Sequence, residues 1–323
     1  MSKFRWKSSP VVRRYEGNPV LTKDDVPYPV DQAYNAGVER FKGRYVMVFR
    51  SEHWVHQWNK TERRLGFATS EDGLKWTVQE GFLKPEGVHQ AEDPRLFVIE
   101  GRLYVTFANN SPDGLRGCIA VSDDFENWEL LYQSAPDNRN FVLFPERING
   151  MYGRLERPFR GYQHEKPAET WYNESPDMKH WGTPRICLRA NAVPFCNEKN
   201  GPAGQPIKTE KGWLTPFHAA FVDEEVEFTS WRNEHWNKTY CVGVMMLDLA
   251  DPAKIIGMSP EPLMVPEAPY EYELEGFRGH ALFPTATVLE DDGTVRIYYG
   301  ACDTVLAMAT AKLEDLIGLC KPV

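Results

Sequence analysis

Short apolar runs bounded by glycine turns recur along the whole chain, and each run has the length of a β-strand. Three of them occupy residues 41–49, 100–107 and 149–155, where a glycine is followed by residues rich in Val, Leu, Phe, Tyr and Met. A glycine turn between two such runs is typical of a β-hairpin. Long segments with helical periodicity are missing, which argues against a TIM barrel or a Rossmann fold. The pattern predicts an all-β chain.

A seven-residue motif, S-x-D-x-x-x-W, follows each of these three strands. It starts at Ser70, Ser122 and Ser175, so the copies are 52 and 53 residues apart. The Ser and Asp side chains suit a turn that binds its own backbone, and the Trp suits an apolar slot between sheets. Two degenerate copies of the surrounding unit span 210–248 and 292–311. A period of about 50 residues indicates a repeat architecture.

The repeats favour a closed ring of sheets. A unit of about four short strands cannot bury both faces alone, whereas five units in a ring can, and closure protects the strand edges. The expected fold is therefore all-β, a five-bladed β-propeller. We expect a single domain over residues 1–323, with the propeller at about 14–317 and a short turn at 314–317. A generic all-β protein is the alternative.

Composition and charge exclude several classes of protein. With 13% aromatic residues the 323-residue chain is not a disordered tail, and its net charge of −9 gives no broad basic surface for nucleic acid. No apolar run approaches the roughly 18–20 residues of a membrane span, and no signal peptide is visible at the N-terminus. The cysteines lack metal-binding spacing, so we expect free thiols, no metal site and a cytoplasmic location. They are Cys118, Cys187, Cys196, Cys241, Cys302 and Cys320.

Polar clusters stand where the innermost strand of each expected blade begins. In a propeller these positions converge at the mouth of the central channel, which is what a pocket needs. The five clusters are residues 35–37, 92–95, 139–140, 201–204 and 283–286.

Asp93 is the candidate acid among them. It precedes Pro94, which fixes the backbone, and the apolar strand 96–99. An Asp at the channel mouth is suited to general acid catalysis if burial raises its pKa. The alternative is an Asp that caps a turn and pairs with Arg95.

A second set of residues is basic. In an acidic protein, arginines and a histidine drawn into one pocket most simply hold an anion, and the guanidinium fork suits phosphate. The alternative is a set of salt bridges to Glu146, Glu156 or other carboxylates. His218 is expected to end the strand 213–217. The set consists of Arg139, Asn140, Arg157, Lys199 and His218.

Further charged residues, Arg50 and Asp303, stand at the ends of apolar strands. A buried charge there is costly unless it is paired or used. Aromatic residues nearby, among them Trp236 and Tyr240, suit either sugar rings or an ordinary propeller core, and composition does not choose between these.

Several segments together resemble a known family. RYEGNPVL, YNAGVERFKGRYVMVFR, AEDPRL, RNFVLFPERINGMY, LERP, TEKGWL followed by FH, LDLADP and IYYGACDTV are similar to the β-mannoside phosphorylases of glycoside hydrolase family 130. The resemblance extends over about residues 14–317, and the members of this family are five-bladed propellers.

The resemblance implies a reaction and roles for matching residues. The reaction is inverting phosphorolysis of a β-1,2- or β-1,4-linked mannoside to α-D-mannose 1-phosphate, with Asp93 as the general acid acting through the mannose 3-hydroxyl. Inorganic phosphate is the co-substrate, and no other cofactor is implied. The partners are a β-mannoside oligosaccharide and phosphate, and a homo-oligomer is expected. The residues expected around phosphate or the neighbouring sugar are Arg139, Asn140, Arg157, Lys199, His218 and Tyr240. Those expected to bind substrate are Asn35, Arg50, Arg64 and Asp303.

The chain also departs from the family pattern. Glu92 replaces the Tyr that often precedes the Asp, Ala219 replaces a Gly after His218, and Cys302 stands where Ala is common. Residues 221–239 look longer than usual and are expected to shape the acceptor subsite. Two alternatives stay open: a β-mannosidase that uses water, and a non-catalytic sugar-binding propeller. The basic cluster favours phosphate over water.

Overall fold

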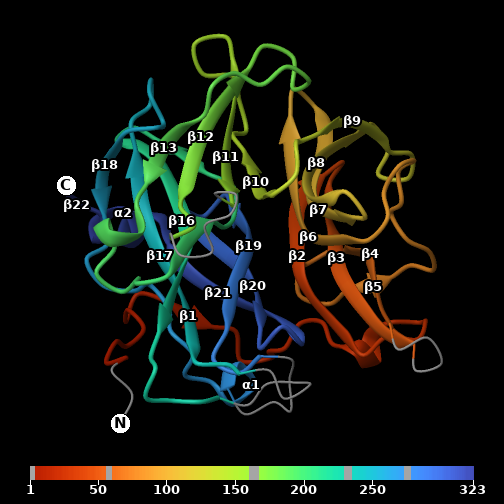
Figure 1. The fold of residues 1–323 in the computed structure, drawn as a ribbon, viewed down its shortest axis with the longest axis horizontal. Coiled ribbons are helices and arrows are strands. Elements are labelled where there is room, and N and C mark those ends of the chain that lie inside the picture. Colours follow the sequence, from red (N-terminus) through yellow and green to blue (C-terminus); the bar gives the residue numbers. More distant parts are fainter. Residues whose placement is uncertain (1–3, 56–59, 160–166, 229–234, 273–277) are drawn as a thin grey trace.

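The computed structural model describes residues 4–55, 60–159, 167–228, 235–272 and 278–323. In these segments the strands form five antiparallel sheets arranged in a ring, so the chain is a five-bladed β-propeller, as predicted (Figure 1). No helix in the described part of the chain is long and apolar enough to cross a membrane.

The first three blades are four-stranded meanders in chain order. Blade 1 consists of β2 (Gln32–Phe41), β3 (Arg44–Val55), β4 (Lys60–Ser70) and β5 (Thr77–Val78). Blade 2 consists of β6 (Ala91–Ile99), β7 (Arg102–Ser111), β8 (Gly114–Ser122) and β9 (Glu129–Gln133). Blade 3 consists of β10 (Asn138–Leu143), β11 (Tyr152–Pro158), β12 (Thr170–Ser175) and β13 (Arg185–Leu188).

The last two blades are completed by the ends of the chain. Blade 4 consists of β14 (Lys199–Pro202), β15 (Ile207–Thr209), β16 (Gly212–Val222), β17 (Lys238–Leu247), β18 (Ile255–Met258) and the C-terminal β22 (Lys321–Pro322). Blade 5 consists of β19 (Leu282–Leu289), β20 (Thr294–Ala301), β21 (Val305–Lys312) and the N-terminal β1 (Arg13–Arg14). Because β1 pairs with β21, the first residues of the fold close the ring against the last blade.

Short helical segments complete the elements. They are η1 (Lys23–Asp25), η3 (Ala190–Ala192), α1 (Pro269–Tyr272) and α2 (Leu313–Leu319). The turn expected at 314–317 is thus part of the helix α2, which leads the chain back to β22 in blade 4.

The S-x-D-x-x-x-W motif forms the same turn between the third and fourth strands of blades 1, 2 and 3. In blade 2, Ser122 Oγ accepts a hydrogen bond from the Phe125 amide at 2.9 Å. Asp124 Oδ1 accepts from the amides of Glu126 and Asn127 at 2.9 and 2.8 Å. The Trp side chains pack between blades, as expected: Trp76 of blade 1 lies edge-on to a Tyr of β20 in blade 5.

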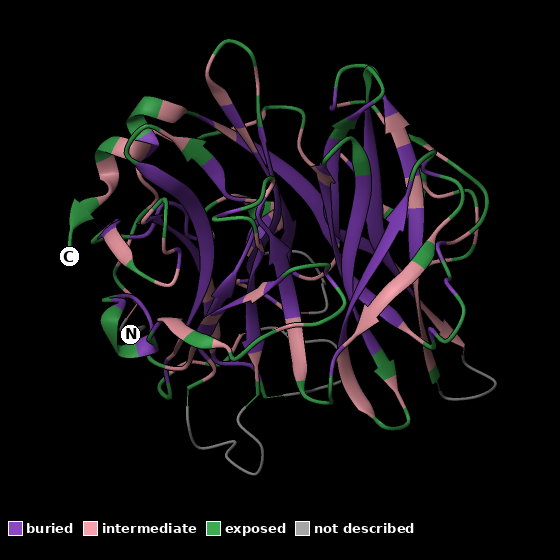
Figure 2. Ribbon diagram, turned by 90° about the horizontal axis from the view of Figure 1, so that it is seen from above, coloured by how far each residue is buried: buried purple, intermediate pink, exposed green. Residues whose placement is uncertain are grey.

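The apolar core lies along the seams between neighbouring blades. Figure 2 shows buried strands gathered toward the middle of the molecule and exposed residues at the connecting loops. Each core cluster joins strands of adjacent blades, so no blade has a complete core of its own. The six cysteines are free thiols, as predicted.

The inner strands approach one another closely, and Gly37 of β2 is where blades 1 and 2 touch. A Cβ atom on Gly37 would lie 2.5 Å from the Leu96 amide nitrogen and 2.7 Å from the Arg95 Cα atom. Both are backbone atoms, which cannot turn away as a side chain can.

Gly37→Ala is therefore expected to destabilise the fold by about 1–3 kcal/mol, the usual cost of overpacking a core. Urea unfolding followed by tryptophan fluorescence measures the difference. Gly318→Ala is the control, because no atom lies within 4 Å of its added methyl group in α2. Equal stability of the two variants would contradict the close packing of these blades.

Candidate active site

A bulge near the start of the innermost strand turns one side chain of each of the first three blades toward the channel. The ladder register shifts around Asn35 in β2, Asp93 in β6 and Asn140 in β10. These residues have positive φ angles of 44°, 54° and 57°. Asn and Asp tolerate this left-handed conformation better than most residues, and bulges commonly re-aim side chains beside active sites.

The side chains converge on one cavity at this end of the channel. It has a volume of about 140 Å³ and is lined by residues of all five blades, including five cationic side chains and two carboxylates. Every residue expected at the site lines it except Asn140, His218 and Arg64. Asn140 Oδ1 accepts a hydrogen bond from the lining residue Arg139 at 3.3 Å, and His218 contacts Arg157, whereas Arg64 lines a neighbouring cavity.

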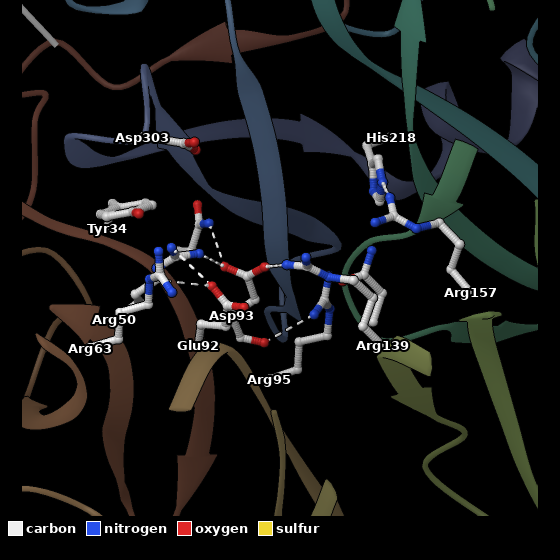
Figure 3. Close-up of polar contacts among 12 residues, drawn as sticks. Tyr34, Arg50, Arg63, Glu92, Asp93, Arg95, Arg139, Arg157, His218 and Asp303 are labelled. Atoms are coloured by element: carbon white, nitrogen blue, oxygen red, sulfur yellow. Dashed lines mark hydrogen bonds and ion pairs between the residues drawn. The ribbon is translucent and has the colours of Figure 1, made fainter. Parts of the chain in front are cut away.

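Asp93 lies at the centre of the site and is almost completely buried, with 3% of its surface exposed. Its Oδ1 atom accepts hydrogen bonds from Asn35 Nδ2 at 2.9 Å and Arg50 Nη1 at 2.8 Å, and its Oδ2 atom pairs with Arg139 (Figure 3). The pairing of its carboxylate with Arg95 that we considered is not formed. Arg95 instead donates to the carbonyl oxygens of Ala203 at 2.7 Å and of Asp93 itself at 3.1 Å.

The pKa of Asp93 moves in the direction opposite to the one expected from burial. Burial alone would raise this pKa, but the guanidinium groups of Arg50 and Arg139, with the amide of Asn35, outweigh it. They hold the pKa of Asp93 well below its ordinary value, so the carboxyl is ionised in this structure. The sequence expectation failed because it considered burial without its two cationic partners.

A network that the sequence analysis did not include holds Arg50 in place. Arg50 Nε donates to Glu52 Oε1 at 2.9 Å, and the Tyr34 hydroxyl donates to the same carboxylate at 2.9 Å. Glu92 pairs with Arg50 Nη2 at 3.0 Å. Residues two apart in a strand share a face, so the charged residues Arg50 and Glu52 within an apolar run could have indicated this network from the sequence.

The basic residues of blades 3 and 4 form a separate lobe beside Asp93. Arg157 Nη1 lies 2.9 Å from His218 Nε2. Since a guanidinium only donates, Nε2 is the acceptor and the proton of the imidazole is on Nδ1. Burial, with the charges of Arg157 and other cations, lowers the pKa of His218 well below its ordinary value, so this side chain contributes a donor and not a charge. It lies within β16, which continues to Val222, and does not end the strand as expected.

Several buried donors in this lobe have no hydrogen-bond partner among the described residues. They are Arg157 Nε, Asn140 Nδ2 and His218 Nδ1. Of the carboxylates named as alternative partners, Glu156 pairs with Arg154 at 2.6 Å and Glu146 pairs with Lys208. Other carboxylates do pair with two members of the basic set, since Arg139 pairs with Asp93 and Lys199 Nζ lies 3.5 Å from Glu198 Oε1. Burial, then the charge of Arg139, lowers the pKa of Arg157 to about 10, so its cation is retained at neutral pH at an electrostatic cost. A lobe that combines cationic side chains with unpaired buried donors is suited to bind an anion.

Lys199 and Tyr240 complete the lobe. Lys199 Nζ lies 5.4 Å from the centre of the Tyr240 ring, which is stacked on Trp236 at 5.9 Å. Trp236 is buried and also lines the cavity, as do Phe159 and Phe283, so the aromatic residues serve both as core and as apolar walls. Trp236 belongs to the segment 221–239 that we expected to shape the acceptor subsite, of which 229–234 lie outside the described residues.

Asp303 faces the cavity from blade 5. Its carboxylate lies 3.6 Å from Arg278, and burial raises its pKa. Asp303 follows the end of β20, as expected, and has a φ angle of 50°. Among the described residues no group of three or more His, Cys, Asp or Glu side chains is placed to hold a metal ion.

A comparison with protein families identifies the chain. A family model described as beta-1,4-mannooligosaccharide phosphorylase matches residues 3–322. The chain belongs to glycoside hydrolase family 130. It is therefore an enzyme, of a family of glycoside phosphorylases.

Individual relatives in the family agree over almost the whole length. A beta-1,4-mannooligosaccharide phosphorylase from Ruminococcus albus is 31% identical over 340 residues, covering 98% of this chain and 94% of the relative. A 1,2-beta-oligomannan phosphorylase from Thermoanaerobacter is 29% identical, covering 94% of this chain and 98% of the relative. The solved structure of the beta-1,2-mannobiose phosphorylase from Listeria innocua, in complex with beta-1,2-mannobiose, superposes with a TM-score of 0.82. It is 25% identical and covers 95% of this chain and 98% of that one.

The charge of Asp93 in this family 130 enzyme has a measurable consequence. We expect Asp93→Asn to destabilise the fold by about 3–5 kcal/mol at pH 7, because it leaves the Arg139 guanidinium without its carboxylate and removes one of the three carboxylate partners of Arg50. Since the pKa of Asp93 is lower in the folded state, its stabilisation is present above the ordinary carboxyl pKa of about 4 and is lost as the pH falls. The difference between the two proteins should therefore shrink below pH 4.

Urea unfolding of both proteins between pH 7 and pH 3 measures this difference. Asp291→Asn is the control, because its side chain is 99% exposed and should change stability little at any pH. A difference between Asp93→Asn and the natural protein that stays constant down to pH 3 would contradict the ionised, doubly paired Asp93.

Proposed function

We propose that the enzyme catalyses inverting phosphorolysis of β-mannosides, yielding α-D-mannose 1-phosphate and a shortened acceptor. One observation carries the proposal: a cationic lobe with unpaired buried donors faces a single buried carboxylate, Asp93, across one small cavity. The relatives support it, since they are named as phosphorylases of β-1,2- and β-1,4-linked mannosides.

Phosphate is the anion that this lobe fits. Arg139, Arg157 and Lys199 come from two adjacent blades and offset the charge of a dianion. His218 and Asn140, which contact Arg157 and Arg139 behind the lining, supply neutral donors. Phosphate is already a nucleophile, so the protein needs only to fix its position and balance its charge. The donors are largely buried and fixed by the strands, so little ordering is required when the anion binds.

Arg139 connects this lobe to Asp93, because the same guanidinium pairs with the proposed acid. A phosphate bound beside Arg139 draws on its positive charge, weakens its hold on Asp93 and raises the pKa of that carboxyl. The binding of the nucleophile thereby prepares the acid. Without bound phosphate, Asp93 stays ionised, which is also its state directly after it has donated its proton.

The proposed step balances in protons and electrons. A phosphate oxygen forms the new bond to the anomeric carbon as the glycosidic bond breaks on the opposite face, and the bond electrons leave with the glycosidic oxygen. Asp93 supplies the proton to that oxygen, through the 3-hydroxyl of the mannose. Hydrogen phosphate carries one proton into the reaction and mannose 1-phosphate does not need it, so this proton restores Asp93.

The remaining residues would hold the mannosyl ring. Asn35, Arg50 and Asp303 surround the space above Asp93, and the Oδ1 atom of Asn35 is a buried acceptor without a partner in the described structure. Hydrolysis in an inverting enzyme would require a second carboxylate about 6.5–9.5 Å from the acid, with water between them. Asp303 is the other carboxylate of the described lining, and it faces Arg278 and not the basic lobe.

The reaction itself is tested with β-1,2- and β-1,4-mannobiose. Cleavage is expected to require added phosphate and to release mannose 1-phosphate in amounts equal to the mannose freed, because the nucleophile is the anion held by the lobe. Ion chromatography of the products, with and without phosphate, measures this. Equal rates in phosphate-free buffer would replace the proposal with hydrolysis, and the preferred disaccharide reports the linkage.

The phosphate lobe is tested with Arg157→Ala. Losing a charge-assisted hydrogen bond costs about 1.5–3 kcal/mol, so the KM for phosphate should rise about 10- to 100-fold. The KM for the mannobiose should change far less, since Arg157 faces the anion. Initial rates at varied concentrations of phosphate and of mannobiose give the KM for each substrate. Arg185→Ala removes an exposed arginine of the same blade as a control, and an unchanged KM for phosphate in Arg157→Ala would assign Arg157 a structural role.

A further inference from the structure

A second and larger cavity lies beside the catalytic one, between the start of β4 and the segment 82–91 that leads into β6. Its volume is about 460 Å³, which is within the range of small-molecule sites, about 300–1,000 Å³. The named relatives assign it no role, and the family resemblance assigns one only to a single residue of its lining. Arg64, expected to bind substrate, lies here and not in the catalytic cavity.

The two cavities share a wall. Arg63 lines the second cavity, and its Nε atom lies 3.2 Å from Glu52 and 3.8 Å from Glu92. Both carboxylates pair with Arg50, which lines the catalytic cavity. The lining of the second cavity also reaches Ala91, two residues before Asp93. The second cavity therefore adjoins the catalytic one on the side of blades 1 and 2.

The stereochemistry of the proposed reaction selects this direction. In an inverting displacement the nucleophile and the leaving group occupy opposite faces of the sugar ring. Figure 3 shows Arg157 and His218 on one side of Asp93, and Arg50, Arg63 and Glu92 on the other. If phosphate binds on the first side, the leaving sugar departs on the second, toward the larger cavity.

The lining of the second cavity suits hydroxyl groups. The guanidinium of Arg64 is fixed from two sides, by its ion pair with Glu62 and by the ring of Phe82, whose centre lies 4.6 Å away. Tyr28 packs edge-on against Phe82 at 4.5 Å and fixes the ring in turn. A donor held in this way loses little freedom when it binds a ligand. Lys60, Lys84 and His89 add exposed donors around it.

We propose that this cavity is a subsite for the second and later sugar units of the leaving oligosaccharide, so that it sets the chain length the enzyme prefers. The inference rests on the proposed function for the direction of the substrate. It identifies the ligand as a neutral oligosaccharide, because the cavity continues the path of the acceptor and its fixed donors match sugar hydroxyls.

The variant Lys84→Ala/His89→Ala tests the proposal, since both side chains are exposed and their loss leaves the core intact. The natural enzyme should have a higher kcat/KM for a β-linked mannotetraose than for the mannobiose. In the variant, the ratio of kcat/KM for mannotetraose to kcat/KM for mannobiose should fall at least about tenfold. Its kcat/KM for mannobiose and its KM for phosphate should stay unchanged.

The matched control is Lys75→Ala/His180→Ala, which removes one lysine and one histidine that are exposed in the turns after β4 and β12. It should keep the ratio of the natural enzyme. An equal ratio in both double variants would overturn the proposal, as would a natural enzyme that does not distinguish the two chain lengths.

Calorimetry in phosphate-free buffer separates this proposal from the proposed function. Tighter binding of mannotetraose than of mannobiose, lost in Lys84→Ala/His89→Ala, supports the subsite even if no phosphorolysis is found. Equal binding of both lengths overturns the subsite even if phosphorolysis is confirmed. A second site for inorganic phosphate that disappears in the same variant would also overturn it, because the cavity would then bind an anion.

Discussion

The carboxylate of Asp93 between two guanidinium groups is the interaction on which the site depends. Arg50 comes from blade 1, Asp93 from blade 2 and Arg139 from blade 3, so one buried charge ties three blades together at the channel mouth. Each charge alone would pay a large desolvation cost, and together they are stable only in this geometry. This group of three charges also connects the two halves of the pocket, since Arg139 belongs to the proposed phosphate lobe and Arg50 to the proposed sugar side.

The propeller supplies the rigidity that this arrangement needs. Positive φ angles at Asn35, Asp93 and Asn140 are unfavourable for residues with a Cβ atom and persist only where the surroundings impose them. Arg95 provides part of that constraint by crossing from β6 to the carbonyl oxygens of Pro202 and Ala203 in blade 4. Buried contacts of this kind across the channel hold the inner strands at fixed distances. The side chains on their bulges therefore cannot relax independently.

Much of the propeller fold could be predicted from the sequence, because each repeat forms its turn from residues that are close together in the chain. The S-x-D-x-x-x-W turn is made by its own seven residues, so three copies at a fixed spacing were enough to place the blades and the inner strands. The direction of the Asp93 pKa depends on guanidinium groups 43 and 46 residues away in the chain, and their distances are a property of the ring. The same reason explains Arg64, which is adjacent to Arg63 in sequence but lines the cavity on the far side of the shared wall.

The two carboxyl groups of the pocket show how the protein sets their charge. Asp93 is buried and Asp303 is partly buried, and both carry a cost of desolvation. Asp93 has two guanidinium partners at hydrogen-bonding distance and a lowered pKa, whereas Asp303 has one at 3.6 Å and a raised pKa. Cationic partners, more than burial, thus decide the direction in which each pKa moves. An enzyme that uses Asp93 as its acid must therefore remove part of that cationic charge during the cycle. Arg139 is the partner that the phosphate lobe can take, since Arg50 is already held by Glu52 and Glu92. In the proposed reaction, the anion that attacks the sugar is thereby also the ligand that allows the acid to carry its proton.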